Sequence, residues 1–188
     1  TMRKFFTLLW LLCPVAAVYY HFNEGQNELL RVQARQKVEN IRAMEGQPEP
    51  DWPAIMEAYD ELSAMLPKSE APLVQHQIRL ARTKAQLETL DVAGSIEELT
   101  ELLRESAQTH GETAKITRAV REMLGKAHYY ATSLLKTSGA AEEEWRPFAE
   151  RTRQIFRFLA EHQEPGALQK YEDRVAAEFE KSIWNGRQ

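Results

Sequence analysis

Cysteine is nearly absent from this chain of 188 residues, in which Cys13 is the only one. A single cysteine cannot close an intramolecular disulfide, and it cannot supply the paired thiolates of a structural zinc site or a dithiol redox motif. Cys13 also lies inside the long apolar run near the N-terminus, so the rest of the chain has no thiol at all. The stability of that remaining part must therefore come from side-chain packing.

The motifs of the common enzyme classes are missing as well. The sequence has no Gly-x-Ser-x-Gly, no glycine-rich phosphate loop, no His-Glu-x-x-His and no haem-attachment sequence. None of the five histidines lies three or four positions from another, so no two of them share one face of a single helix as metal ligands. We therefore expect no catalytic residue, no metal site and no cofactor, and we interpret the histidines as surface or locally hydrogen-bonded side chains.

Basic blocks are also lacking. The chain has 24 Lys and Arg residues against 28 Asp and Glu residues, a formal net charge of −4. A mildly acidic chain without a basic cluster is not suited to bind nucleic acid or to adhere to anionic lipid. The charged fraction of 28% and the apolar fraction of 43% are typical of a globular domain rather than a disordered one.

One long apolar run is present, at the N-terminus. Arg3 and Lys4 precede it, and it extends almost unbroken from Phe5 to Tyr20. As a helix it would span roughly 24 Å at about 1.5 Å per residue, and residues 2–22 would approach the bilayer core of about 30 Å. We expect a signal anchor; cleavage near Ala17 and a lipoprotein signal at Cys13 are the alternatives. The residues expected to form the anchor are Arg3, Lys4, Phe5, Trp10, Pro14, Tyr19 and Tyr20.

The charges on either side of this run predict its orientation. Cations are retained in the cytoplasm, which places Arg3 and Lys4 there, whereas Glu24 and Glu28 follow the run on the other side. We therefore expect a single-pass protein of the inner (cytoplasmic) membrane with a cytoplasmic N-terminus. Its main domain would be extracytoplasmic, in the periplasm of a diderm bacterium, and only the N-terminal helix would contact the lipid bilayer.

After residue 22, apolar residues recur every three or four positions, and proline and glycine separate the segments, so the expected fold class is all-α. Seven helices are predicted, the first continuing from the anchor to about residue 44 and the others over about 51–66, 72–90, 95–110, 112–136, 142–162 and 166–179. The expected division is an anchor (1–22), a helical extension and linker (23–50) and a helical domain (51–188). Ser95 and Glu98 fit a capping box at the start of one helix. Asp51 is expected to cap the helix over 51–66, with Pro53 in its first turn.

Two predictions concern the core. The helix over 72–90 has one apolar stripe that contains Ile78 and Ala85 and a second that consists of Leu73, Leu80 and Leu87. In the helix over 142–162, Trp145 and Phe156 lie on the apolar stripe, and we expect both to be core residues.

Two segments resemble the tetratricopeptide (TPR) repeat. AIMEAYDELSAMLPKS (54–69) is similar to its second helix, with Tyr59 eight residues before Pro67, and LGKAHYY (124–130) is similar to its first. The resemblance implies a TPR-like α-solenoid; an irregular antiparallel helical bundle is the alternative. Ile55 and Leu62 stand where the family has small residues, and no 34-residue period is found.

A weaker resemblance covers residues 127–161. AHYYATSLLK and AAEEEWRPFAERTRQIFRFLAE are similar to uncharacterised helical proteins encoded beside MoxR-type AAA+ ATPases and von Willebrand factor A proteins. This resemblance is not specific enough to transfer any site residue.

Partner recognition is the function that these features favour. Arg146, Arg153 and Arg157 share the polar face of the helix over 142–162, where a solvated, salt-bridged surface is the simpler interpretation. Tyr129 lies off the core stripe of its helix, so it either binds a partner or contacts a neighbouring helix. We expect a non-enzymatic scaffold or accessory subunit that binds other protein subunits. A helical bundle that binds a small molecule or cofactor is the alternative.

Overall fold

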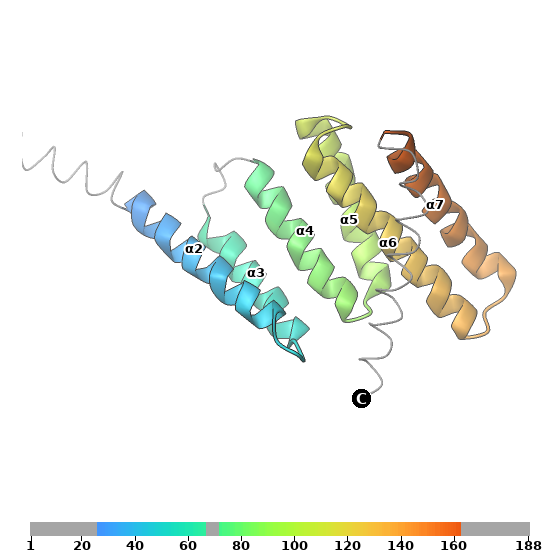
Figure 1. The fold of residues 1–188 in the computed structure, drawn as a ribbon, viewed down its shortest axis with the longest axis horizontal. Helices are drawn as coiled ribbons and strands as arrows, with labels where there is room; N and C mark the ends of the chain where they lie inside the picture. Colours follow the sequence, from blue (N-terminus) through green and yellow to red (C-terminus); the bar gives the residue numbers. More distant parts are fainter. Residues whose placement is uncertain (1–25, 67–71, 163–188) are drawn as a thin grey trace, which may run out of the picture.

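The computed structural model describes residues 26–66 and 72–162, and these form α-helices without any β-strand (Figure 1). The expected all-α fold class is confirmed for this part of the chain. The predicted anchor and the predicted helix over 166–179 lie outside the described residues. The helices are α2 (Gln26–Glu45), α3 (Trp52–Met65), α4 (Pro72–Glu88), α5 (Val92–His110), α6 (Lys115–Thr137) and α7 (Glu142–Glu161).

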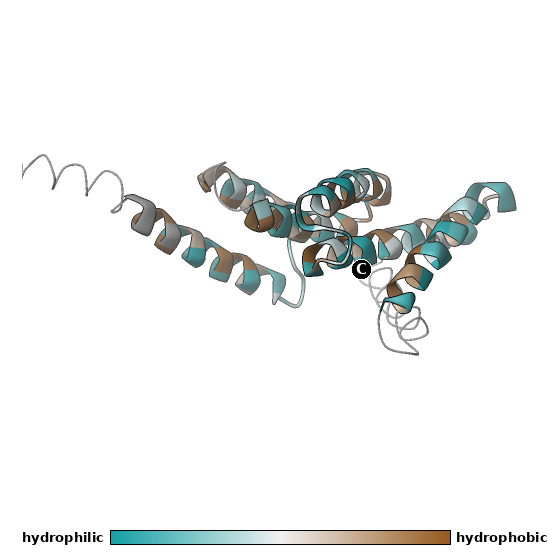
Figure 2. Ribbon diagram, turned by 90° about the horizontal axis from the view of Figure 1, so that it is seen from above, coloured by the Kyte–Doolittle hydropathy of each residue, from teal (hydrophilic) through white to brown (hydrophobic). Residues whose placement is uncertain are grey.

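The helices form a row in which each packs against the next one along the chain (Figure 1). Neighbours run antiparallel because short connections join them. One further contact links α4 and α6, which are not consecutive. There the Nζ atom of Lys126 lies 3.5 Å from a carboxylate oxygen of Glu88. Each helix carries both hydrophobic and hydrophilic residues, as packing of one face against a neighbour requires (Figure 2).

Two hydrophobic clusters form the core, and α4 contributes to both. The N-terminal cluster joins α2, α3 and α4, and its buried members are Ile41, Ile55, Ala58, Leu62, Ile78 and Ala85. The C-terminal cluster joins the end of α4 to α5, α6 and α7, and its buried members are Leu87, Val92, Leu99, Leu102, Ile116, Val120, Leu124, Ala127, Tyr130, Ala131, Ile155, Phe156 and Leu159. The first predicted stripe of α4 is confirmed, because Ile78 and Ala85 belong to the N-terminal cluster. In the second stripe, Leu87 and Leu80 belong to or pack against the C-terminal cluster, whereas the prediction for Leu73 was wrong, because this residue is 40% exposed.

The contact between α6 and α7 is close because Gly125 has no side chain. A Cβ atom at Gly125 would lie only 2.6 Å from Cε1 of Phe156 and 3.0 Å from Cγ2 of Ile155. Phe156 has no exposed surface, so the prediction that it is a core residue is confirmed. Trp145 is only half-buried, so the same prediction for Trp145 was wrong. Its ring lies beside the last turn of α6, where Lys136 Nζ is 4.0 Å from the ring centroid.

Aspartate side chains cap the starts of α3 and α5, as predicted for α3 but not for α5. Asp51 caps α3 as a side-chain acceptor for the backbone N–H of Ala54, at 3.1 Å. The predicted capping box at Ser95 and Glu98 was wrong, because α5 begins at Val92 and Asp91 is its N-cap. The Ser95 hydroxyl instead donates to the backbone carbonyl of Asp91, and Glu98 pairs with a residue of α4. Asp91, four positions before Ser95, thus accepts a hydrogen bond from one of the free N–H groups at the start of this helix, that of Gly94.

Candidate functional site

A polar cluster lies between α4 and α5, centred on two histidines. His76 is on α4 and His110 is the last residue of α5, and Nδ1 of His76 lies 3.1 Å from Nε2 of His110. The two rings meet edge to face, with an angle of 87° between their planes. Only 7% of the surface of His76 is exposed. The histidines are 34 positions apart, so spacing along a single helix could not predict this pair.

Three charged residues complete this cluster, which we call the His–His cluster (His76, Arg79, Glu98, Glu105 and His110). Arg79 lies one turn after His76 and pairs with Glu98 at 2.8 Å and with Glu105. A carboxylate oxygen of Glu105 lies 3.8 Å from Nε2 of His76. Besides the two imidazoles, the cluster contains one cation and two carboxylates. All of these contacts link α4 to α5.

Burial lowers the pKa of His76 below its usual 6.5, and the nearby charges of His110 and Arg79 act in the same direction, while Glu105 opposes them. His76 is therefore neutral at pH 7. A neutral imidazole carries one N–H donor and one free lone pair. The His–His cluster can therefore share a proton between its rings or present a nitrogen lone pair to an electrophile.

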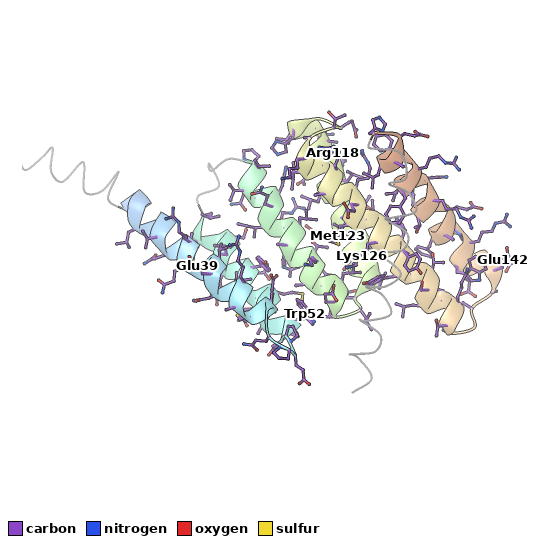
Figure 3. All side chains as sticks on the ribbon, viewed as in Figure 1. Glu39, Trp52, Arg118, Met123, Lys126 and Glu142 are labelled. Atoms are coloured by element: carbon purple, nitrogen blue, oxygen red, sulfur yellow. The ribbon has the colours of Figure 1, made fainter. Side chains whose placement is uncertain are left out.

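The predicted partner-binding arginines lie on the outer side of α7, at one end of the described row. Arg146, Arg153 and Arg157 are all exposed. Arg146 pairs with Glu150 at 3.0 Å and with Glu142 at 3.7 Å, as the salt-bridged interpretation expected. Arg153 and Arg157 make no hydrogen bond or ion pair within the described segments. Figure 3 shows side chains projecting outward from α7, with Glu142 at its start.

Tyr129, the fourth predicted partner-binding residue, lies on α6. It is partly buried and packs against the C-terminal cluster. The structure therefore shows that at least part of the Tyr129 side chain contacts neighbouring helices, which is one of the two predicted alternatives. The structure does not bring Tyr129 together with the exposed arginines into one described contact.

His128, one position before Tyr129, is a second histidine that the sequence did not single out. Burial lowers its pKa to about 4, and the nearby positive charge of Arg151 contributes. Its ring lies 5.8 Å from that of Phe148, between α6 and α7. Its Nδ1 atom is buried and has no hydrogen-bond partner among the described residues. His128 is thus a neutral packing residue whose ionisation would be costly.

The anchor residues Arg3, Lys4, Phe5, Trp10, Pro14, Tyr19 and Tyr20 lie outside the described residues. Among the helices from α2 to α7, none is long and apolar enough to cross a bilayer. Comparison of the whole chain with protein-family models, with curated proteins and with solved structures found no match.

Proposed function

We propose that this protein is a membrane-tethered, extracytoplasmic helical scaffold, an accessory subunit that binds other proteins in a membrane-associated complex. The observation that supports this proposal best is the row of helices. Because each helix packs mainly against its neighbours in the chain, the row keeps long outer surfaces free for binding. In this proposal the N-terminal apolar run is the tether, and it raises the effective concentration of the domain near membrane partners.

The row also supports a TPR-like solenoid as the architecture. Alternate helices α2, α4 and α6 begin at Gln26, Pro72 and Lys115, so successive helix pairs start more than 34 residues apart. The small residue Gly125 lies at a close helix contact, as the small residues of TPR helices do. The proposed solenoid therefore has longer and less regular repeats than the TPR family.

The outer side of α7 is the proposed docking surface. Arg153 and Arg157 are exposed and have no ion-pair partner within the described segments, so no described residue neutralises their charges. Arginine is enriched at the energetic centres of protein interfaces. The chemistry fits an acidic segment of another membrane-associated protein.

Crosslinking in native membranes followed by mass spectrometry tests the proposal. The chain with Arg153→Glu and Arg157→Glu should lose the crosslinked partner, because reversed charges repel an acidic surface by several kcal/mol. The matched control is Arg35→Glu with Lys84→Glu, since both residues are exposed and the net charge changes equally. The control should retain the partner. Equal recovery with both variants would reject α7 as the docking surface, and no specific crosslink with the wild type would reject the scaffold function.

Reporter fusions test the location separately. A periplasmic phosphatase fused after Gln188 should be active, and a cytoplasmic reporter at the same position should be inactive, because Arg3 and Lys4 are expected to stay inside. The reverse pattern would reject the proposed topology. Exchange of the apolar run for an unrelated single span of the same orientation should preserve function if the run is only a tether.

A further inference from the structure

The His–His cluster has no role in the proposed scaffold function. We propose that His76 Nδ1 and His110 Nε2 form a binding site for a divalent transition-metal ion of the Zn²⁺, Ni²⁺ or Cu²⁺ class, with water molecules as the remaining ligands. The ion would join α4 to α5 near the C-terminal end of α5. Within the described segments, no group of three or more His, Cys, Asp or Glu residues could hold a metal ion, so the two imidazoles would be the only protein ligands of this ion.

The distance between the two nitrogen atoms fits this assignment. Imidazole nitrogens bind zinc at about 2.0–2.1 Å, so two of them at ligand angles of roughly 100–110° are about 3.1–3.4 Å apart. The observed separation is 3.1 Å. The edge-to-face arrangement of the rings, at 87°, keeps each imidazole from stacking on the other. Metal binding requires His110 to carry its proton on Nδ1, which frees the lone pair of Nε2, and both rings to turn until the two lone pairs point to one position.

A carboxylate lies near the second nitrogen of His76, although at 3.8 Å it is beyond hydrogen-bond distance and acts only through its charge. A metal-bound histidine generally presents its other N–H to a carboxylate or a carbonyl, and this contact fixes the tautomer and the ring orientation. Here the carboxylate of Glu105 faces Nε2 of His76. With the proton on Nε2, the lone pair is on Nδ1 and points toward His110. Arg79 pairs with Glu105 and so holds the carboxylate in place.

The local charge also favours a cation. The single positive charge of Arg79 is outweighed by Glu98 and Glu105. His110 belongs to the last turn of α5, where the backbone carbonyls give the helix its negative end. Imidazole ligands select Zn²⁺, Ni²⁺ and Cu²⁺ over Mg²⁺ and Ca²⁺, which prefer oxygen.

Isothermal titration of the full chain, in detergent micelles and after removal of any affinity tag, tests the proposal with ZnCl₂ and NiCl₂. The wild type should bind one ion at this site with a dissociation constant below about 100 µM, and MgCl₂ should give no signal. His110→Gln should weaken this binding at least tenfold. The matched control is His162→Gln, because His162 is exposed and ends another helix; it should change the affinity less than twofold. Circular dichroism should show that both variants remain helical.

Electron paramagnetic resonance of bound Cu²⁺ provides a readout that does not depend on affinity. The wild type should show hyperfine coupling to two imidazole nitrogens, and His110→Gln should show one. Equal Zn²⁺ affinity in the wild type and His110→Gln, or no binding up to 1 mM, would show that the two rings form only a hydrogen bond. These outcomes do not depend on whether the protein is a scaffold, because no partner enters the assay.

Discussion

Replacement of Gly125 by alanine should destabilise the protein, although alanine is the better helix former. Gly125 lies within α6 at a position where Ile155 and Phe156 of α7 pack directly against its backbone. The added Cβ would be 2.6 Å from Cε1 and 3.1 Å from Cζ of Phe156, well inside van der Waals contact. Phe156 has no exposed surface, so its ring cannot rotate into solvent to make room. Either the ring leaves its preferred rotamer or α6 and α7 move apart.

The size of the effect follows from two opposing contributions. Forcing an extra carbon into a packed core typically costs 1–3 kcal/mol. Exchange of glycine for alanine within a helix typically contributes about 1 kcal/mol in the other direction. Since the nearest atoms belong to a buried ring, we expect the steric cost to be larger. The net loss should be about 1–2 kcal/mol in the free energy of unfolding, measured by chemical denaturation of the full chain in micelles.

Gly94→Ala is the matched control. Gly94 also lies in a helix, and its added Cβ would also be 2.6 Å from two other atoms, but these are the ends of the Asp91 and Gln86 side chains. Gln86 can move at little cost, but Asp91 caps α5 through the N–H of Gly94, so this change should cost at most the roughly 1 kcal/mol of that cap, and Phe156→Leu should not relieve the loss. A double-mutant cycle of Gly125→Ala with Phe156→Leu should recover about 1 kcal/mol, because leucine lacks the two ring atoms that clash. A Gly125→Ala variant as stable as the wild type would refute the close α6–α7 contact.

Three further predictions concern stability. Phe156→Ala should cost about 3–5 kcal/mol in denaturant unfolding, because a fully buried ring is removed, whereas Arg153→Ala should cost less than about 0.5 kcal/mol. Asp91→Ala should cost about 1 kcal/mol and reduce the helical signal, because the acceptor for the N–H of Gly94 is lost. His128 has a pKa of about 4 when folded and about 6.5 when unfolded, so its contribution to stability is complete above about pH 6.5 and is lost as the pH falls toward 4. His128→Gln should therefore flatten the pH dependence of unfolding over that interval; an unchanged profile would contradict its buried, neutral state.

Much of the helical architecture could be predicted because it depends on local sequence. The apolar stripes of α4 identified both of the clusters it joins, because a helix that packs on two sides must carry two apolar faces. Asp51 and the proline at the start of α3 likewise marked a helix start that the structure confirms. The start of α5 was less certain from sequence, since Asp91 and Ser95 are both good N-cap residues. Packing of Val92 into the C-terminal cluster selects the earlier one.

The His–His cluster could not be predicted, because its residues come from two helices. A search for histidines three or four positions apart detects only ligands on one helix, whereas His76 and His110 meet across two helices. The feature of the sequence that could have indicated this pair is the antiparallel order of α4 and α5. It places the start of α4 beside the end of α5, and each of these ends carries a histidine. Trp145 was misassigned because a helical stripe does not reveal where the neighbouring helix ends.

Stability alone does not account for the polar residues between α4 and α5. A partly exposed ion pair such as Arg79–Glu98 typically contributes only about 0–1 kcal/mol. Burial of His76 removes an imidazole from water, and apolar residues of similar volume in such a place are often neutral or stabilising. The apolar contacts of α4 are made by other residues, which belong to the two hydrophobic clusters. The polar contacts thus orient α4 on α5 more than they stabilise the pair, and the two imidazoles 3.1 Å apart are the part of this interface that the proposed metal site would use.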